Sequence, residues 1–188
     1  MPIRRHSAAL DRTPQGGFGL IELVITIAIV AILAGLAFPS FAYVLRSNRV
    51  STQTNDFLSA LNLARNEAIT RSRPVTICAA DTRTGTPSAC GDKEDWKHGW
   101  MVFLDTSGPL PATITAADIV RTWVGNESNS LVHADGESYL RFNARGESVA
   151  GADVSFTLKP AESCSNKQQR TITVAPTGRA ASTAVDCS

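Results

Sequence analysis

The residues with the clearest chemistry near the N-terminus are Gly17, Phe18 and Glu22, which lie where a long apolar run begins. The run spans residues 18–45, and Glu22 is its only charged side chain. A helix of about 20 apolar residues is long enough to span a bilayer, so this segment is predicted to enter a membrane. A carboxylate is costly in hydrocarbon, and we therefore expect Glu22 to have a cationic partner.

Four cysteines, Cys78, Cys90, Cys164 and Cys187, follow the apolar run. An even number in an exported domain indicates two disulfides, and three pairings are possible. We expect the pairs closest in sequence, Cys78–Cys90 and Cys164–Cys187, each stabilising the domain by about 2–4 kcal/mol. A zinc site is disfavoured because no CxxC spacing occurs and the histidines lie apart from the cysteines. We expect no bound metal and no cofactor.

No catalytic constellation is evident. The sequence lacks the GxSxG nucleophile elbow, the HExxH zinc motif and a phosphate-binding loop. The three histidines are also scattered along the chain; they are His6, His98 and His133. The chain is therefore predicted not to be an enzyme.

A single helix is predicted from residue 18 to about residue 72. Its first half is apolar all round, whereas its second half has one apolar face at helical spacing. That face consists of Val50, Phe57, Leu58, Leu61, Ala64, Ala68 and Ile69. Gly35 and Pro39 interrupt the first half, and Pro39 should kink or loosen the helix because it cannot donate a backbone hydrogen bond. Pro74 should end the helix.

Short strand-like segments separated by turn residues follow Pro74. They are Val75–Ala79, Trp100–Leu104, Ile119–Val124, Leu131–His133, Tyr139–Phe142, Val154–Leu158 and Thr171–Val174. Such segments favour an antiparallel sheet, against which the apolar face of the helix would pack. The stretch from 106 to 117 is predicted to be a loop. The fold class is therefore α+β, with a long N-terminal helix packed on an antiparallel β head.

Composition limits the choice of partners. The whole chain has 18 basic and 17 acidic residues. From Pro74 onward there are ten Lys or Arg and thirteen Asp or Glu, a net charge of −3. Non-specific binding to nucleic acid depends on Lys and Arg neutralising phosphates, so the head is not a general polyanion binder.

The residues from Gly17 to Glu22 resemble the processing site of a type IV prepilin. In that family a prepilin peptidase cleaves after the glycine, here Gly17, and N-methylates the new first residue, here Phe18. The resemblance implies that Glu22 of one subunit neutralises the amine of Phe18 of another in the filament core. It also implies local unwinding near Pro39 in assembled filaments, with a simple kink as the alternative.

Two other interpretations of the N-terminal segment remain open. One is a secretory signal peptide with a cleavage site at Gly35-Leu36-Ala37, which would release a soluble protein. The other is a plain transmembrane anchor. Neither accounts for a glutamate inside the apolar run.

The head carries three segments that are similar to those of the GspH/FimT family of type IV minor pilins and pseudopilins. They are Arg73–Cys78, Trp96–Asp105 and Ile172–Arg179, of which the second has the Trp-x-x-Gly-Trp pattern. The resemblance, most like the FimT/FimU group, implies a 1–17 leader, an 18–45 transmembrane and filament-core helix, a 46–73 amphipathic half and a 74–188 periplasmic head. Trp96 and Trp100 are expected to pack in the core.

The function implied by this resemblance is structural. The chain would be a minor pilin that helps to initiate a type IV pilus near its tip, together with the major pilin and other minor pilins. It would sit in the bacterial inner membrane as a single-pass protein before assembly and in the pilus at the cell surface afterwards. The first alternative is a GspH-like pseudopilin of type II secretion.

DNA binding is the second alternative. Some FimT-type proteins bind DNA during natural transformation through a Gly-Arg-x-Arg motif near the C-terminus. This chain has the first arginine only, in Gly178-Arg179-Ala180-Ala181. The candidate DNA contacts are Lys167, Arg170 and Arg179, and the competing interpretation is a solvated loop held by Cys164 and Cys187.

Overall fold

The computed structural model describes residues 19–105, 108 and 113–188, without the side chains of 36–40. Gly17, Phe18, the 1–17 leader and most of the predicted 106–117 loop up to residue 112 lie outside the described residues. Internal contacts divide the chain into two units, Met1–Ala42 and Tyr43–Ser188, and each is considered by itself.

One helix, α1, spans Leu20–Arg71 and confirms the predicted long helix. Helical backbone continues over Pro39, so α1 is not broken there, and the predicted kink or loosening stays a prediction. A helix can run past a proline with the loss of a single hydrogen bond. Unwinding at Pro39 inside a filament stays a prediction.

The C-terminal end of α1 is a Schellman motif. Ser72 adopts a left-handed φ of 51°. The amide of Ser72 donates to the carbonyl of Ile69 and the amide of Arg73 to that of Ala68, each at 3.2 Å. These bonds satisfy carbonyls that the helix end would leave unpaired. Pro74 follows, and β1 begins at the next residue.

Within the described part of the head, the strands form two four-stranded antiparallel sheets. The first sheet has the order β3–β2–β1–β5, and the second has the order β4–β6–β7–β8. The strands are β1 Val75–Ala79, β2 Gly99–Leu104, β3 Ile119–Val124, β4 Asn129–His133, β5 Tyr139–Phe142, β6 Val154–Pro160, β7 Gln169–Val174 and β8 Ala180–Val185. Two 3-10 helices, η1 Lys93–Lys97 and η2 Asn166–Gln168, lie between strands. The predicted antiparallel arrangement is confirmed.

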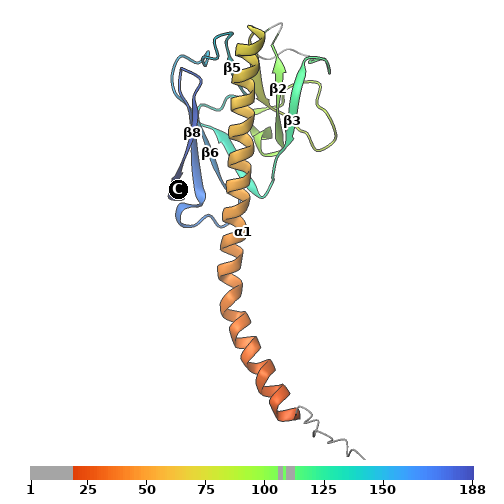
Figure 1. The fold of residues 1–188 in the computed structure, drawn as a ribbon, viewed down its shortest axis with the longest axis vertical. Coiled ribbons are helices and arrows are strands. Elements are labelled where there is room, and N and C mark those ends of the chain that lie inside the picture. The colour runs from red at the N-terminus through yellow and green to blue at the C-terminus, as the bar shows by residue number, and fades with distance from the viewer. Residues whose placement is uncertain (1–18, 106–107, 109–112) are drawn as a thin grey trace, which may run out of the picture. The chain divides into compact units, whose positions relative to one another are not determined.

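The second half of α1 lies against the two sheets and completes one core (Figure 1). Phe57 is fully buried, and its ring meets Trp96, Trp100 and Phe156 edge-on with centroids 4.8–5.7 Å apart. Such edge-to-face pairs add to the large area that each aromatic side chain buries. The core role predicted for Trp96 and Trp100 is confirmed.

Most of the predicted apolar face of α1 is buried, but Ile69 is not. Val50, Phe57, Leu61, Ala64 and Ala68 are at most 1% exposed, whereas Ile69 is 44% exposed. Ile69 follows the fully buried Ala68 by one position, which is about 100° further round the helix, so its side chain lies at the border of the buried face.

The C-terminal tail differs from its prediction as a solvated loop. Residues Ala180–Val185 form strand β8, which pairs with β7 from Val174↔Ala180 to Gln169↔Val185. Its sequence of Ala, Ser and Thr carries little strand signal of its own. The pairing follows from the tight Ala175–Arg179 turn, which folds the chain back on β7.

Two disulfides staple the head, and they join the sequence-local pairs. Cys78 of β1 is bonded to Cys90, and Cys164 is bonded to Cys187 beyond the end of β8. The first fastens the segment after β1 to the sheet, and the second ties the chain's C-terminal end to the segment before η2. Each bond restricts the unfolded chain and so favours the folded head.

Candidate assembly and recognition surfaces

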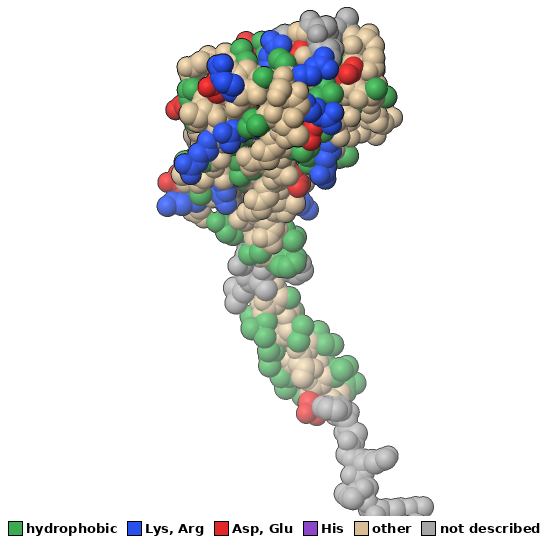
Figure 2. All heavy atoms as spheres, turned by 45° about the horizontal axis from the view of Figure 1, so that its top comes forward, with side chains coloured by type: hydrophobic (Ala, Val, Ile, Leu, Met, Phe, Trp, Pro, Cys, Tyr) green, Lys and Arg blue, Asp and Glu red, His purple; other side chains and the backbone are tan. Residues whose placement is uncertain are grey.

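The N-terminal part of α1 is an exposed apolar surface. From Leu20 to Leu33 its large aliphatic side chains are 52–81% exposed. Figure 2 shows apolar side chains over this part of the helix. An exposed apolar surface of this extent marks a site of contact with another protein or a membrane. No helix within the described residues combines the length and apolarity needed to cross a membrane.

Glu22 lies in the first turn of α1 and is exposed. A carboxylate is favourable at this position because the first amides of a helix carry partial positive charge. The amides of Glu22 and Leu23 both donate to the carbonyl of Gly19 at 3.1 Å, which fixes the turn that holds the side chain. Glu22 can therefore accept a cation from outside the chain without a change in the helix.

Polar contacts fasten the second half of α1 to the head. The side-chain Nδ2 of Asn129 donates to Gln53 Oε1 at 2.7 Å, and both side chains are buried. Nearer the end of the helix, Arg65 Nε donates to the carbonyl of Gly146 at 3.2 Å. Buried polar bonds of this kind have strict geometry, so they fix how this half of the helix is seated on the sheets.

The Trp-x-x-Gly-Trp segment serves the fold. Trp96 Nε1 donates to the carbonyl of Glu137 at 3.0 Å. Gly99 has a φ of 145°, and a Cβ there would collide with Thr82 and the carbonyl of Trp123. Only glycine fits such a backbone position with so little space. The two tryptophans and the glycine thus position β2.

Asp105 closes the same segment as a buried acceptor. Thr76 Oγ1 donates to Asp105 Oδ2 at 3.0 Å, and the amide of Gly108 donates to Oδ1 at 2.7 Å. Arg141 Nε lies 2.6 Å from Oδ2 in an ion pair. This carboxylate connects β1, β5 and the chain that follows β2.

A charged network covers another part of the head. Arg83 contacts Asp81 and Glu127, and His98 lies 3.0 Å from Asp95 and 3.4 Å from Glu127. Hydrogen bonds from Arg83 hold the pKa of Asp81 far below its usual range, and Asp81 in turn raises the pKa of Arg83. Within the described ranges no group of three or more His, Cys, Asp or Glu could hold a metal ion.

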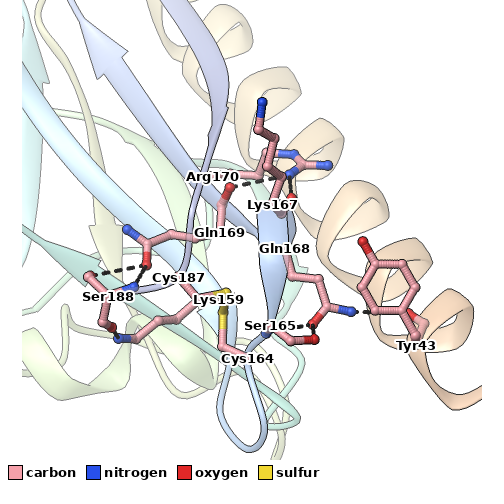
Figure 3. Close-up of a disulfide and its surroundings, with 10 residues drawn as sticks. All are labelled: Tyr43, Lys159, Cys164, Ser165, Lys167, Gln168, Gln169, Arg170, Cys187 and Ser188. Carbon is pink, nitrogen blue, oxygen red and sulfur yellow. Dashed lines mark hydrogen bonds between the residues drawn. A yellow bond between two sulfur atoms is a disulfide. The ribbon is translucent and has the colours of Figure 1, made fainter. Parts of the chain in front are cut away.

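The candidate DNA contacts are not gathered at one place. Lys167 and Arg170 lie together beside the Cys164–Cys187 disulfide (Figure 3). The Arg170 side chain bonds to the carbonyls of Lys167 and Gln169 at 2.7 and 3.2 Å. Arg179 lies at the other end of the β7–β8 hairpin, roughly 15 Å along the strand by the usual rise per residue.

The C-terminal end is held in a fixed position near the same disulfide. Lys159 Nζ donates to the Ser188 carbonyl oxygen at 2.7 Å, and the Ser188 amide donates to Gln169 Oε1 at 3.3 Å (Figure 3). Gln168, which is fully buried, donates to the carbonyl of Tyr43 in α1 at 3.1 Å. No local pattern predicts these contacts, because each one joins residues far apart in the chain.

A long helix with an exposed apolar start, a charge in its first turn and a disulfide-stapled β head defines the class of pilin-type subunits. Two family models match the chain. The model described as type II transport protein GspH matches residues 53–178, and the prokaryotic N-terminal methylation motif matches residues 12–38. The chain therefore belongs to the GspH family, whose members are type IV minor pilins and pseudopilins.

Solved structures show the same fold. Two crystal forms of the type IV minor pilin FimU from Pseudomonas aeruginosa are 19% identical to this chain and cover 71% of it. The matches span 91% and 87% of the FimU chains, with TM-scores of 0.53 and 0.54. No curated protein matches the chain significantly. At this identity the likeness establishes the shared pilin fold.

These comparisons confirm the family expected from the sequence. Its members are structural subunits and are not known as enzymes. The methylation motif covers Gly17, Phe18 and Glu22, which agrees with the prepilin-type start of the chain. Members of the family associate with other pilins and are processed as prepilins, and the chain shares these general properties.

Proposed function

We propose that this chain is a minor pilin that helps to initiate type IV pilus assembly near the filament tip. The observation that carries the proposal is the exposed apolar start of α1, Leu20–Leu33, which lies within the matched N-terminal methylation motif at residues 12–38. Among the described residues nothing covers this surface, whereas a filament core made of neighbouring helices would bury it. The fold shared with FimU, which is described as a type IV minor pilin, supports the choice.

The mechanism begins with processing of the 1–17 leader. A prepilin peptidase cleaves after Gly17 and N-methylates Phe18, which leaves a cationic amine at the start of the helix. Glu22 then pairs with the amine of a neighbouring subunit. In a low-dielectric core this attraction is strong, and an unpaired charge is heavily penalised, so the pair selects the docked register.

Each segment has its own role in this proposal. Residues 18–45 anchor the chain in the inner membrane as a single span and later enter the filament core, where Pro39 permits local unwinding. The amphipathic 46–73 half joins this segment to the periplasmic head, residues 74–188. The head contacts the major pilin and other minor pilins.

Mass spectrometry of filaments sheared from the cell surface tests the proposal. We expect the chain to be present, to start at methylated Phe18 and to have its cysteines oxidised. Gly17→Ala is the matched control, because it should block processing. The variant chain should then stay in the membrane with the mass of the unprocessed protein. Absence of the processed wild-type chain from sheared filaments would contradict a role in the pilus.

The second candidate is a pseudopilin of type II secretion, favoured by the description of the matching family as GspH. It uses the same processing and the same helix. Processed protein that remains in the inner membrane, together with loss of secreted proteins on deletion of the chain, would support this candidate over the pilus.

DNA binding by Lys167, Arg170 and Arg179 has weaker support, since Arg179 lies apart from the other two. Binding to a polyanion needs several neutralised phosphates at once. A mobility-shift assay on the processed chain in detergent tests it, with Arg179→Ala alongside. A salt-sensitive shift that Arg179→Ala abolishes would establish the activity.

A further inference from the structure

The four outer strands of the two sheets differ in how their free edges are protected. In the first sheet, β3 carries the charged Arg121 and has an extra residue, Val120, where the register shifts opposite Val102 and Phe103. Strand β5 is covered by the returning chain, since the Val149 amide donates to the carbonyl of Arg141 at 3.0 Å. Bulges, charges and covering segments are the usual means by which edges avoid pairing with other chains.

In the second sheet only one edge is protected in this way. Beside β4 lies η1, which places Lys93 and Lys97 along the same shallow groove as Ser130–His133. Strand β8 has no such cover among the described residues. Its six residues contain no charge and no proline, and Ala181–Ala184 are all exposed.

The pairing register shows which backbone groups of β8 are free. The amide of Ala175 donates to the carbonyl of Arg179, so this pair is hydrogen-bonded. Hydrogen-bonded and non-bonded pairs alternate along an antiparallel ladder. The backbone groups of Ala180, Ser182 and Ala184 therefore point away from β7. Three outward residues offer up to about six hydrogen bonds to an added strand.

The free edge is held in place before any partner arrives. One end of β8 is fixed by the turn at Ala175–Arg179, and the other by the Cys164–Cys187 disulfide and the Ser188–Gln169 bonds (Figure 3). An edge that is already ordered loses little entropy when a strand is added.

We propose that an extended segment of a neighbouring pilin-type subunit adds to the β8 edge and continues the second sheet. This proposal rests on the pilin function proposed above. Ser182 lies opposite the buried Ile172, and Ala180 borders the core, so both side chains are on the core-facing side of the sheet. An added strand would therefore suit this face best if its side chains there are small or apolar. An acidic residue in the partner would suit Arg179 at one end of the edge.

A second copy of this chain fits the edge less well. A symmetric pair of β8 strands is antiparallel, and in the view of Figure 1 β8 and the second half of α1 run in nearly the same line. Such a pair would turn the two helices in opposite directions, whereas subunits of one filament need their helices aligned. The occupant is therefore a different subunit that presents an extended segment to β8.

Ser182→Pro tests the edge directly. Proline removes the outward amide and places its ring where the partner strand would lie, but the β7–β8 bonds remain because Ser182 does not donate to β7. We expect the amount of the full chain in sheared filaments to fall at least tenfold when it carries Ser182→Pro. Ser182→Ala keeps the amide and should cause a much smaller loss. Equal amounts of wild-type and Ser182→Pro chains in filaments would overturn the proposal.

Amide hydrogen exchange on the wild-type chain gives a second readout that needs no variant. The amides of Ala180, Ser182 and Ala184 should exchange at least tenfold more slowly in filaments than in the processed chain in detergent. Unchanged exchange would contradict strand addition even if Ser182→Pro failed to fold, which its melting temperature and disulfides would reveal.

Two further outcomes are distinct. Absence of the wild-type chain from filaments contradicts the proposed function itself. A processed chain that is dimeric in detergent, and monomeric with Ser182→Pro, shows a second copy at the edge and overturns the assignment of the partner.

Discussion

At the scale of single residues, Asp105 shows how a family signature can be structural. The carboxylate is buried and accepts hydrogen bonds from Thr76 and Gly108. Its ion-pair partner Arg141 keeps 28% of its side-chain surface exposed. Removing the carboxylate leaves the buried Thr76 hydroxyl without its acceptor, and an unsatisfied buried polar group is costly.

Asp105→Ala should therefore destabilise the head by about 2–4 kcal/mol, below the full cost of breaking a buried pair because Arg141 is partly solvated. Asp105→Asn keeps an acceptor oxygen for Thr76 but loses the one that accepts from Gly108, so it should cost less than Asp105→Ala. Urea unfolding with the disulfides intact measures both variants. A loss under about 0.5 kcal/mol for Asp105→Ala would show that the cluster contributes little.

His133 gives the head a dependence on pH. It is 3% exposed, packs 4.7 Å from Phe156 and accepts the Asp135 amide on Nδ1 at 3.1 Å. Burial lowers its pKa, although Asp135 and Glu137 act in the opposite direction. Below the unfolded-state pKa of about 6.5 the unfolded chain binds a proton that the folded chain does not. The free energy of unfolding therefore decreases as the pH is lowered.

The stability of the wild-type head should thus decrease as pH falls from about 7.5 to 5.5, by at most about 1.4 kcal/mol per unit below 6.5. His133→Asn keeps an acceptor for Asp135 and should show a flatter profile over this range. Urea unfolding at several pH values checks the difference. Parallel profiles for the two proteins would mean that His133 is not the titrating group.

At the scale of elements, the end of α1 offers a stabilising change. Ser72 is exposed and adopts a φ of 51°, which costs a residue with a Cβ about 1 kcal/mol. Ser72→Gly relieves this strain and should raise stability by about 0.5 kcal/mol after its larger unfolded-state entropy is counted. Ser59→Gly, at an exposed position inside α1, should lower stability by a similar amount. Melting temperatures that shift in the same direction for both would refute the argument.

The sequence predicted the elements better than their arrangement. Strands with apolar or β-branched residues, such as Val75–Ala79 and Tyr139–Phe142, have the predicted bounds. Strand β8 was missed because its small polar residues form a strand only through pairing with β7. The division into two sheets also depends on contacts far apart in the chain, for example β1 with β5, which no local pattern encodes.

At the scale of the whole molecule, the candidate site was predictable where its signal is local. The start of the chain could be interpreted from its composition alone, since one glutamate in an apolar run is unusual. The β8 edge could not, because its free backbone groups follow from the alternating ladder of the β7–β8 hairpin. Similarly, the basic residues Arg170 and Arg179 look close in sequence, yet the hairpin places them at opposite ends.

The proposed role of Glu22 needs a second subunit, because its cationic partner is the N-terminal amine of a neighbour. Glu22→Ala should leave cleavage after Gly17 intact, since the peptidase acts before assembly, but should lower incorporation into filaments at least about tenfold. A lost pairing of about 1.4 kcal/mol already accounts for that factor, and an unpaired amine in the filament core costs more.

Glu22→Gln is the sharper control for this prediction, since it keeps the size of the side chain and one acceptor oxygen but removes the charge. Mass spectrometry of the inner membrane and of sheared filaments measures processing and incorporation in the same cells. If charge pairing guides docking, both variants should be methylated at Phe18 in the membrane and depleted from filaments. Normal incorporation of Glu22→Gln, with Glu22→Ala depleted, would instead assign the role to the shape of the side chain.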